Sequence, residues 1–210
     1  MSGESCRWAR EEFASDPVTL AQRLIGALLV RTLDTGERLS GMIVETEAYL
    51  GVQDKAAHSF GGRRTARTEP MFGQPGTVYV YFTYGMHHCM NVVCGAVDEP
   101  VAVLIRAVEP VEGIDRIRVN REAGKPRKTP LKSTDLCSGP AKLCQGFGVD
   151  RSLSGIDLID GNALHIEHYP NAMTVLGLVN SERIGIGYAE EWVMRPLRWH
   201  LSQNRHVSRN

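Results

Sequence analysis

The 210-residue sequence lacks the features that would place it in a membrane or a secretory pathway. No uninterrupted apolar run approaches the roughly 20 residues that a membrane-spanning helix needs. The amino-terminal residues contain no apolar core of a signal peptide, so we expect a cytoplasmic protein that does not contact a membrane. The five cysteines form an odd set without a Cys-x-x-Cys pair, which excludes zinc-finger spacing and disfavours a disulfide framework.

The sequence also has no excess charge of either sign, because 24 Lys and Arg balance 24 Asp and Glu. The distribution, however, is uneven. Residues 116–132 hold seven basic residues and one acid, Glu122, and no acid follows Glu191, although four arginines do. Residues 63–67 hold three more arginines. Such local excesses can bind phosphates, but solvated loops have the same composition, so charge alone leaves a nucleic-acid partner open.

The order of predicted elements favours one β-rich α+β domain. Asp16 can cap a helix that begins at Pro17, and apolar residues at helical spacing follow. Strands are predicted at 28–33, 39–49, 76–83, 86–94 and 101–108, with further helices after 112 and 140. We therefore expect a curved, largely antiparallel sheet with flanking helices and a protruding β-hairpin. Residues 1–13 are predicted to be a loosely ordered terminus, and residues 14–210 a single domain.

The end of the strand predicted at 39–49 is the most informative stretch of the chain. Strict alternation places Met42, Val44, Thr46 and Ala48 on one face, and Ile43, Glu45, Glu47 and Tyr49 on the other. Two carboxylates about 7 Å apart on one strand face could divide acid and base roles. Their apolar neighbours should also shift their pKa values. Exposed glutamates that pair with arginines would have the same spacing.

Aromatic residues gather in a second run, about thirty residues later. Tyr79 and Tyr81 share one strand face, where core packing is the default, and Tyr84 stands at the predicted hairpin tip. An aromatic ring at such a tip could stack on or wedge between bases. His58 lies in a loop, and the chain offers no further ligands at metal-binding spacing, so no metal site is predicted. Asn91, among apolar neighbours, needs partners for its amide.

These motifs resemble, in order, those of the alkyladenine (3-methyladenine) DNA glycosylases that have the vertebrate-type fold and no helix–hairpin–helix. The matching segments are Val44–Gly51 (VETEAYLG), Asp54–Ser59 (DKAAHS), Gly61–Arg63, Met71–Phe72, Pro75–Tyr81 (PGTVYVY), Tyr84–Met86, Cys89–Asn91, Leu104–Ala107 (LIRA), Leu136–Pro140 (LCSGP), Lys142–Cys144 and Glu191–Trp192. The resemblance covers roughly residues 14–201. It implies that residues 14–210 form a single glycosylase domain.

The resemblance implies a DNA-repair hydrolase that flips alkylated or deaminated purines out of double-stranded DNA. Glu47 would be the general base that activates a water for attack on the anomeric carbon, with Arg106 beside the water and a phosphate. The motif holds no lysine that could form a Schiff base, so we expect a monofunctional enzyme that leaves an abasic site and has no lyase activity. We expect no cofactor, no obligate protein partner, a monomer, and association with nucleoid DNA in the cytoplasm.

The resemblance also implies how the lesion would be held. Tyr49 would stack on one face of the flipped base, with His58 and Tyr81 on the other. Asn91 would disfavour unmodified guanine by a clash with its exocyclic amine. Tyr84 would fill the hole that the flipped base leaves in the duplex.

Some positions depart from the family pattern, and two rival functions remain. His87-His88 stand where the family pattern leads us to expect more aromatic or apolar residues, and Tyr188 stands where some relatives have histidine. Gly73-Gln74 and the basic loop 120–133 belong to variable parts of the pattern, which leaves phosphate contacts and lesion preference open. One rival is a non-catalytic damaged-DNA or RNA binding module that uses the same tyrosines. The other is a small-molecule hydrolase in which Glu45 and Glu47 form an acid–base pair.

Overall fold

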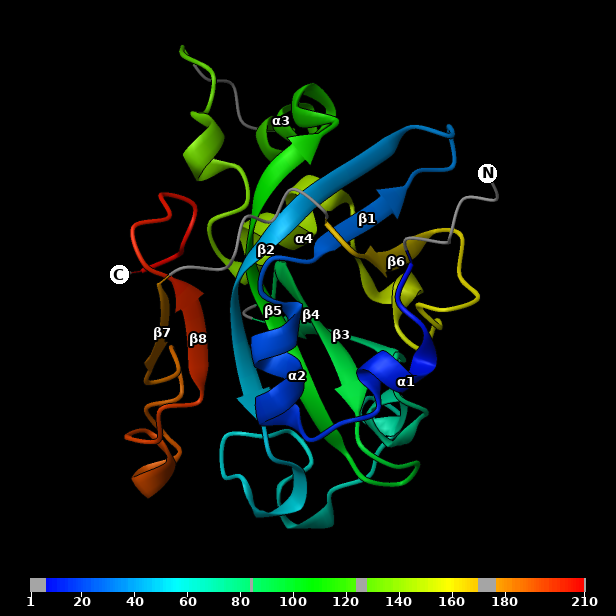
Figure 1. Ribbon diagram of the computed structural model, residues 1–210, viewed down its shortest axis with the longest axis vertical. Coiled ribbons are helices and arrows are strands. Elements are labelled where there is room, and N and C mark those ends of the chain that lie inside the picture. Colours follow the sequence, from blue (N-terminus) through cyan, green and yellow to red (C-terminus); the bar gives the residue numbers. More distant parts are fainter. Residues whose placement is uncertain (1–6, 84, 124–127, 170–176, 210) are drawn as a thin grey trace.

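The computed structural model describes residues 7–83, 85–123, 128–169 and 177–209 (Figure 1). The α-helices are α1 (Arg10–Phe13), α2 (Pro17–Leu24), α3 (Ile114–Glu122) and α4 (Pro140–Phe147). The strands are β1 (Leu28–Thr32), β2 (Arg38–Tyr49), β3 (Val78–Thr83), β4 (His87–Cys94), β5 (Val101–Glu112), β6 (Leu164–Glu167), β7 (Leu178–Ser181) and β8 (Arg198–Leu201). Short 3-10 helices are η1 (Gly51–Gln53), η2 (Phe60–Gly62), η3 (Glu69–Phe72), η4 (Ser133–Asp135), η5 (Arg151–Leu153) and η6 (Glu190–Trp192). Among these described helices, none has the length and apolar character that crossing a membrane requires.

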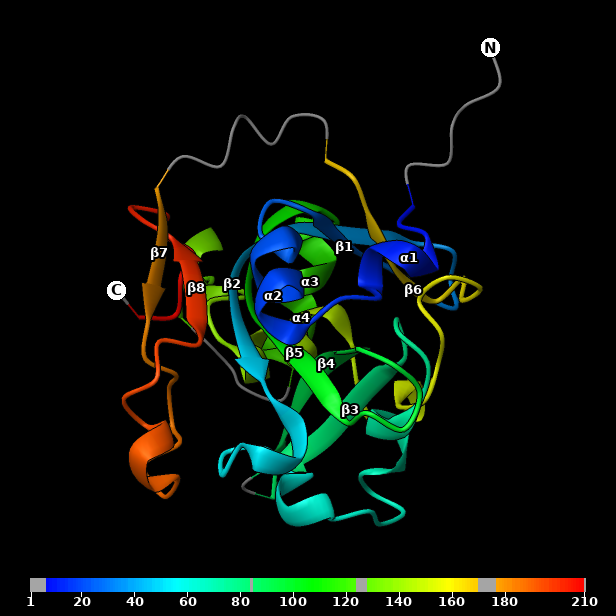
Figure 2. The ribbon, with the colours of Figure 1, turned by 60° about the horizontal axis from the view of Figure 1, so that its bottom comes forward.

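All eight strands belong to one sheet. Its main order is β3-β4-β5-β2-β1-β6, and β8 pairs with both β2 and β7. Every strand pairing is antiparallel. The long strands β2 and β5 curve through the centre of the molecule, with α2 beside them (Figures 1 and 2). The predicted α+β fold, with its curved antiparallel sheet and flanking helices, is confirmed.

Two bulges in the pairing of β2 with β5 determine where the central polar side chains point. The register runs from Ile43–Val108 to Glu45–Ala107 and then to Thr46–Ile105. Val44 is therefore an extra residue on β2, and Arg106 is an extra residue on β5. Because a bulge bends its strand and redirects a side chain, Arg106 meets the glutamates of the neighbouring strand.

The first bulge also corrects the faces predicted for β2. Strict alternation grouped Ile43 with the two glutamates, and Val44 with Ala48 on the opposite face. Ile43 instead joins the main core together with Ala48, and Val44 packs with Ala107 and Val207 in a separate small cluster. The alternation prediction assumes a regular strand, so it fails wherever one extra residue shifts the phase.

The prediction of a loosely ordered amino terminus is wrong for residues 7–13. Phe13 is fully buried and Trp8 nearly so, and both belong to the main core. Their ring centroids lie 5.3 Å apart, and the backbone N–H of Trp8 donates to Ile166 O of β6 at 2.9 Å. Two large aromatic rings bury enough apolar area to fix this short segment against the domain.

The predicted helix cap and hairpin are both present. Asp16 Oδ1 accepts hydrogen bonds from the backbone N–H groups of Val18 and Thr19, each at 3.0 Å. Strands β3 and β4 pair as a hairpin that closes with Thr83 opposite His87. Tyr84, which was predicted at the tip, lies outside the described residues.

Candidate active site

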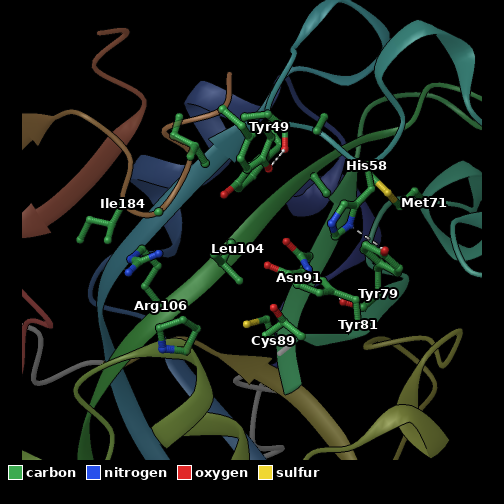
Figure 3. Close-up of a pocket in the computed structure, with 18 residues that line it drawn as sticks. Tyr49, His58, Met71, Tyr79, Tyr81, Cys89, Asn91, Leu104, Arg106 and Ile184 are labelled. Atoms are coloured by element: carbon green, nitrogen blue, oxygen red, sulfur yellow. Dashed lines mark hydrogen bonds between the residues drawn. The ribbon is translucent and has the colours of Figure 1, made fainter. Parts of the chain in front are cut away.

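A cavity of about 310 Å³ opens between the end of β2, the hairpin β3–β4, strand β5 and residues 184–188 (Figure 3). Its lining comprises Tyr49, Ala56, Ala57, His58, Met71, Tyr79, Tyr81, Thr83, Cys89, Asn91, Ala102, Leu104, Arg106, Pro140, Ile184, Gly185, Ile186 and Tyr188. This volume lies at the lower end of the range for small-molecule pockets. The lining combines aromatic and aliphatic surface with a few polar groups, which suits a flat, mostly apolar ligand.

Three aromatic residues form a packed cluster along one wall of the cavity. His58 Nδ1 lies 2.9 Å from the Tyr79 hydroxyl. The His58 ring meets Tyr81 edge-on, with centroids 4.6 Å apart, and Tyr79 and Tyr81 lie 5.7 Å apart. In Figure 3, Tyr49 lies on a different side of the space from this cluster. A planar ligand could therefore contact aromatic rings on both of its faces.

The pKa of His58 is lowered to about 4. Burial is the largest cause, and the positive charges of Arg67 and Arg63 add to it. The imidazole therefore stays neutral near pH 7 and adds no positive charge to the wall of the cavity. A neutral aromatic wall is compatible with a cationic ligand, which an imidazolium would repel.

His58 should make the protein less stable in acid. The unfolded chain binds a proton at His58 with a pKa near 6.5, while the native pKa is about 4, so stability should fall as the pH drops through this window. Between pH 7 and pH 4.5 the loss from this group should be on the order of 2 kcal/mol. Urea unfolding of the wild type and His58→Gln at both pH values measures it. The exposed His168, changed to Gln, is the control. An equal loss in the wild type and His58→Gln would refute the assignment.

Glu47 is fully buried, and three groups hold its carboxylate. Oε1 accepts from the backbone N–H of Ile184 at 2.7 Å and lies 3.2 Å from Arg106 Nη1. Oε2 accepts from the Tyr49 hydroxyl at 2.9 Å. Glu47 is not among the residues that line the cavity, but all three of its partners are. A carboxylate oxygen can accept about two hydrogen bonds, and among the described residues Tyr49 alone donates to Oε2, so this oxygen has the capacity for one further donor such as water.

Tyr49 is fixed as a donor to Glu47. Burial, and then the neighbouring charge of Glu47, raise the pKa of Tyr49 well above its ordinary value. Its hydroxyl therefore remains protonated, and Glu47 Oε2 receives a neutral hydrogen bond rather than a second negative charge.

Beyond Glu47, charges of alternating sign continue through the buried interior. Arg106 Nε lies 3.1 Å from Glu45 Oε1, and the same oxygen lies 2.7 Å from Arg198 Nη1. Burial disfavours the charge on Arg106, but Glu47 and Glu45 outweigh it and hold the pKa of Arg106 above its ordinary value. Burial likewise favours a neutral Glu45, yet Arg106, Ser208 and Arg198 keep the pKa of this carboxyl lowered. Both glutamates are thus built into one charge-balanced chain.

A second buried ion pair joins two segments of the cavity wall. Arg183 donates to both oxygens of Asp54, at 2.5 and 2.9 Å, and to Ala48 O at 3.0 Å. Both side chains of the pair are completely buried. The Arg183 guanidinium also lies 4.8 Å from the centre of the Tyr49 ring. Neither partner was predicted from the sequence, because nothing in the spacing of Asp54 and Arg183 indicates that they meet.

The structure brings together most of the residues predicted for the site. Of the seven, Tyr49, His58, Tyr81, Asn91 and Arg106 line the cavity, Glu47 lies directly behind it, and Tyr84 falls outside the described residues. Asn91 Nδ2 donates to Tyr79 O at 3.1 Å, so the amide is tied to the neighbouring strand. The described residues contain no group of three or more His, Cys, Asp and Glu that could hold a metal ion. Ile184, Gly185 and Ile186 also form part of the cavity wall.

Comparison with known proteins identifies the family. Residues 11–205 match the family model "Methylpurine-DNA glycosylase (MPG)". The chain is 44% identical over 207 residues to "DNA-3-methyladenine glycosylase" of Mus musculus and 42% identical over 208 residues to the protein of that name from Homo sapiens. These matches cover 97% and 98% of this chain, which spans 62% of the mouse protein and 69% of the human one. A Clostridium perfringens (strain SM101 / Type A) protein named "Putative 3-methyladenine DNA glycosylase" is 40% identical over 208 residues, which cover 97% of this chain and 99% of that one.

The family model spans nearly the whole described domain, and the matched region contains the cavity and the buried chain of charges behind it. The chain therefore belongs to the methylpurine-DNA glycosylase family.

Proposed function

We propose that this protein is a DNA-repair glycosylase that removes alkylated or deaminated purines from double-stranded DNA. Two relatives with more than 40% identity bear the name DNA-3-methyladenine glycosylase. The observation that carries the proposal is the buried Glu47 carboxylate, held by Arg106 and Tyr49 at the edge of an aromatic-walled cavity. Hydrolysis of an N-glycosidic bond requires a group that can accept a proton from water beside a cavity that binds the flat ring of the base, and this site combines the two.

The recessed shape of the cavity supports base flipping as part of the proposal. A purine stacked in a duplex cannot enter a recessed pocket, so the nucleotide must rotate out of the helix first. Tyr49 would then contact one face of the base, and His58 and Tyr81 the other. A purine alkylated on a ring nitrogen is cationic, and electron-rich rings beside a neutral imidazole favour it.

Glu47 would act as the general base in the chemical step. A water bound at the open position of Glu47 Oε2 would lose its proton to the carboxylate as its oxygen bonds to the anomeric carbon. The glycosidic C–N bond breaks, and its electron pair stays with the departing purine. Arg106, with Nε and Nη1 directed at the two glutamates, would use Nη2 toward the water or a phosphate. The products are a free base and an abasic site.

Other features support hydrolysis without strand cleavage. A lyase would need an amine to form a Schiff base, and the residues that line the cavity include no lysine.

Asn91, with its Nδ2 tied to Tyr79 O, would present the oxygen side of its amide to the base and so influence which purines fit. Tyr84 would fill the space that the flipped base leaves, and the protein would work as a monomer on nucleoid DNA.

The arrangement argues against a small-molecule hydrolase with an acid–base pair of glutamates. Glu45 is fully buried, does not line the cavity, and accepts four hydrogen bonds from Arg106, Arg198 and Ser208. Such a carboxylate, enclosed by protein and paired with two arginines, cannot reach a substrate in the cavity to exchange a proton with it. A non-catalytic damage binder would need the same aromatic walls but not the carboxylate behind them.

An excision assay tests the proposal. Excess protein is incubated with duplexes that each hold one hypoxanthine, ethenoadenine or 3-methyladenine-type lesion, and abasic sites are revealed by alkali. We expect strand breaks only after alkali, only at the lesion, and none in an undamaged duplex. Tight lesion binding without any abasic product would instead identify a damage-binding protein.

A further inference from the structure

Glu45 holds a position that the proposed chemistry does not use directly. Its Oε1 meets Arg106 Nε, Arg198 Nη1 and the Ser208 hydroxyl at 3.1, 2.7 and 2.9 Å. Its Oε2 accepts from the backbone N–H of Ser208 at 2.7 Å. The carboxylate is thus completely enclosed, and both of its oxygens accept hydrogen bonds.

Two of these donors come from the end of the chain. The carboxy-terminal segment, residues 204–209, folds back over β2, where Val207 packs against Val44 and Ala107. Arg198 Nη1 also donates to Arg209 O at 3.0 Å, which ties the segment to β8. The segment therefore completes the environment that keeps Glu45 buried and charged.

Arg106 stands between the two glutamates and contacts each through a different nitrogen. Nε faces Glu45 and Nη1 faces Glu47, so the plane of the guanidinium is defined by both carboxylates. Without Glu45, Arg106 would be free to turn both of its nitrogens onto Glu47. Such a bidentate contact, with two parallel N–H···O hydrogen bonds, is frequent and strong in arginine–carboxylate pairs. It would occupy the open position on Glu47 where water must bind.

We propose that Glu45, held in place by Arg198 and Ser208, is a positioning residue for the glycosylase reaction: it draws Arg106 aside so that Glu47 can hold the attacking water. This inference rests on the proposed function. Glu45 does not touch the substrate and acts only through Arg106. Its removal should therefore slow the chemical step and leave binding of the lesion unchanged.

A double-mutant cycle separates positioning from mere support of the strand. The single-turnover excision rate at saturating protein and the lesion Kd are measured for wild type, Glu45→Gln, Arg106→Gln and the double variant. Glu45→Gln should slow excision about 10- to 100-fold, because small displacements of catalytic groups have effects of that size. Its Kd should stay within about threefold, and in the Arg106→Gln background it should have almost no further effect. Equal slowing in both backgrounds, or no slowing, would overturn the inference.

A milder variant serves if Glu45→Gln does not fold. Ser208→Ala removes one hydrogen bond from Glu45, and we expect excision to slow roughly fivefold at unchanged lesion Kd. Ser40→Ala is the matched control, since Ser40 Oγ donates to Glu112 at 2.7 Å elsewhere on β2. Equal rates for Ser208→Ala and Ser40→Ala would contradict the role of Glu45. A wild type that excises no lesion would refute the proposed function itself, whereas an active wild type with an equally active Glu45→Gln refutes only this inference.

Discussion

Replacing Glu47 with glutamine should lower the single-turnover excision rate about 10²- to 10⁴-fold, the usual contribution of a general base. Glutamine keeps the shape of the side chain and can still accept from the Ile184 N–H, but it cannot take a proton from water. Lesion binding should therefore survive, since the cavity walls made by Tyr49, His58 and Tyr81 are unchanged.

Two further variants test whether the loss of rate is specific to the Glu47 carboxylate. Glu112→Gln changes a glutamate at the far end of the same pair of strands, opposite Ser40, and should excise like the wild type. Tyr49→Phe removes one donor to Glu47 but keeps the ring, so its rate should fall less than that of Glu47→Gln. If Glu47→Gln excises lesions within a few-fold of the wild-type rate, another group activates the water.

Replacing Asp54 with alanine should lower the free energy of unfolding by about 3–5 kcal/mol, as expected when one partner of a buried ion pair is removed. Arg183 would then keep a positive charge with no exposure to solvent and no carboxylate. Its remaining contacts, to Ala48 O and the Tyr49 ring, cannot compensate for the lost charge. Urea denaturation, with excision activity followed in parallel, measures the effect.

The adjacent Lys55 provides the control. It joins the same two parts of the chain from outside, with Nζ at 2.7 and 3.0 Å from Glu190 and Glu191. Because solvent-exposed ion pairs contribute little, Lys55→Ala should unfold like the wild type. If Asp54→Ala were as stable as Lys55→Ala, the buried pair would not be what holds these two parts of the cavity wall together.

Local features of the fold could be predicted from the sequence because short-range chemistry determines them. A capping Asp16 before Pro17 predicts the start of α2, and the turn between two apolar runs predicts the β3–β4 hairpin. Residues 7–13 could not be placed in this way. Whether Trp8 and Phe13 are buried depends on a surface supplied by distant parts of the chain.

The motifs predict which residues belong to the site, but they do not predict the hydrogen bonds and ion pairs that connect these residues. Nothing in the spacing of Arg106 along its strand indicates that a bulge in β5 turns it inward to the glutamates, where it is only 6% exposed. The contacts of Arg183 and Ser208 span more than a hundred residues of sequence, and spacing along the chain carries no information about them. Such links follow only from the path of the folded backbone.

A crystal structure of Glu47→Gln bound to a duplex with one hypoxanthine or ethenoadenine would test most directly where the lesion is processed. We predict that the damaged base lies in the cavity, between Tyr49 and the rings of His58 and Tyr81. The anomeric carbon of the attached deoxyribose should face residue 47. A base that remained stacked in the duplex over an empty cavity would contradict both the proposed binding mode and the role of Glu47.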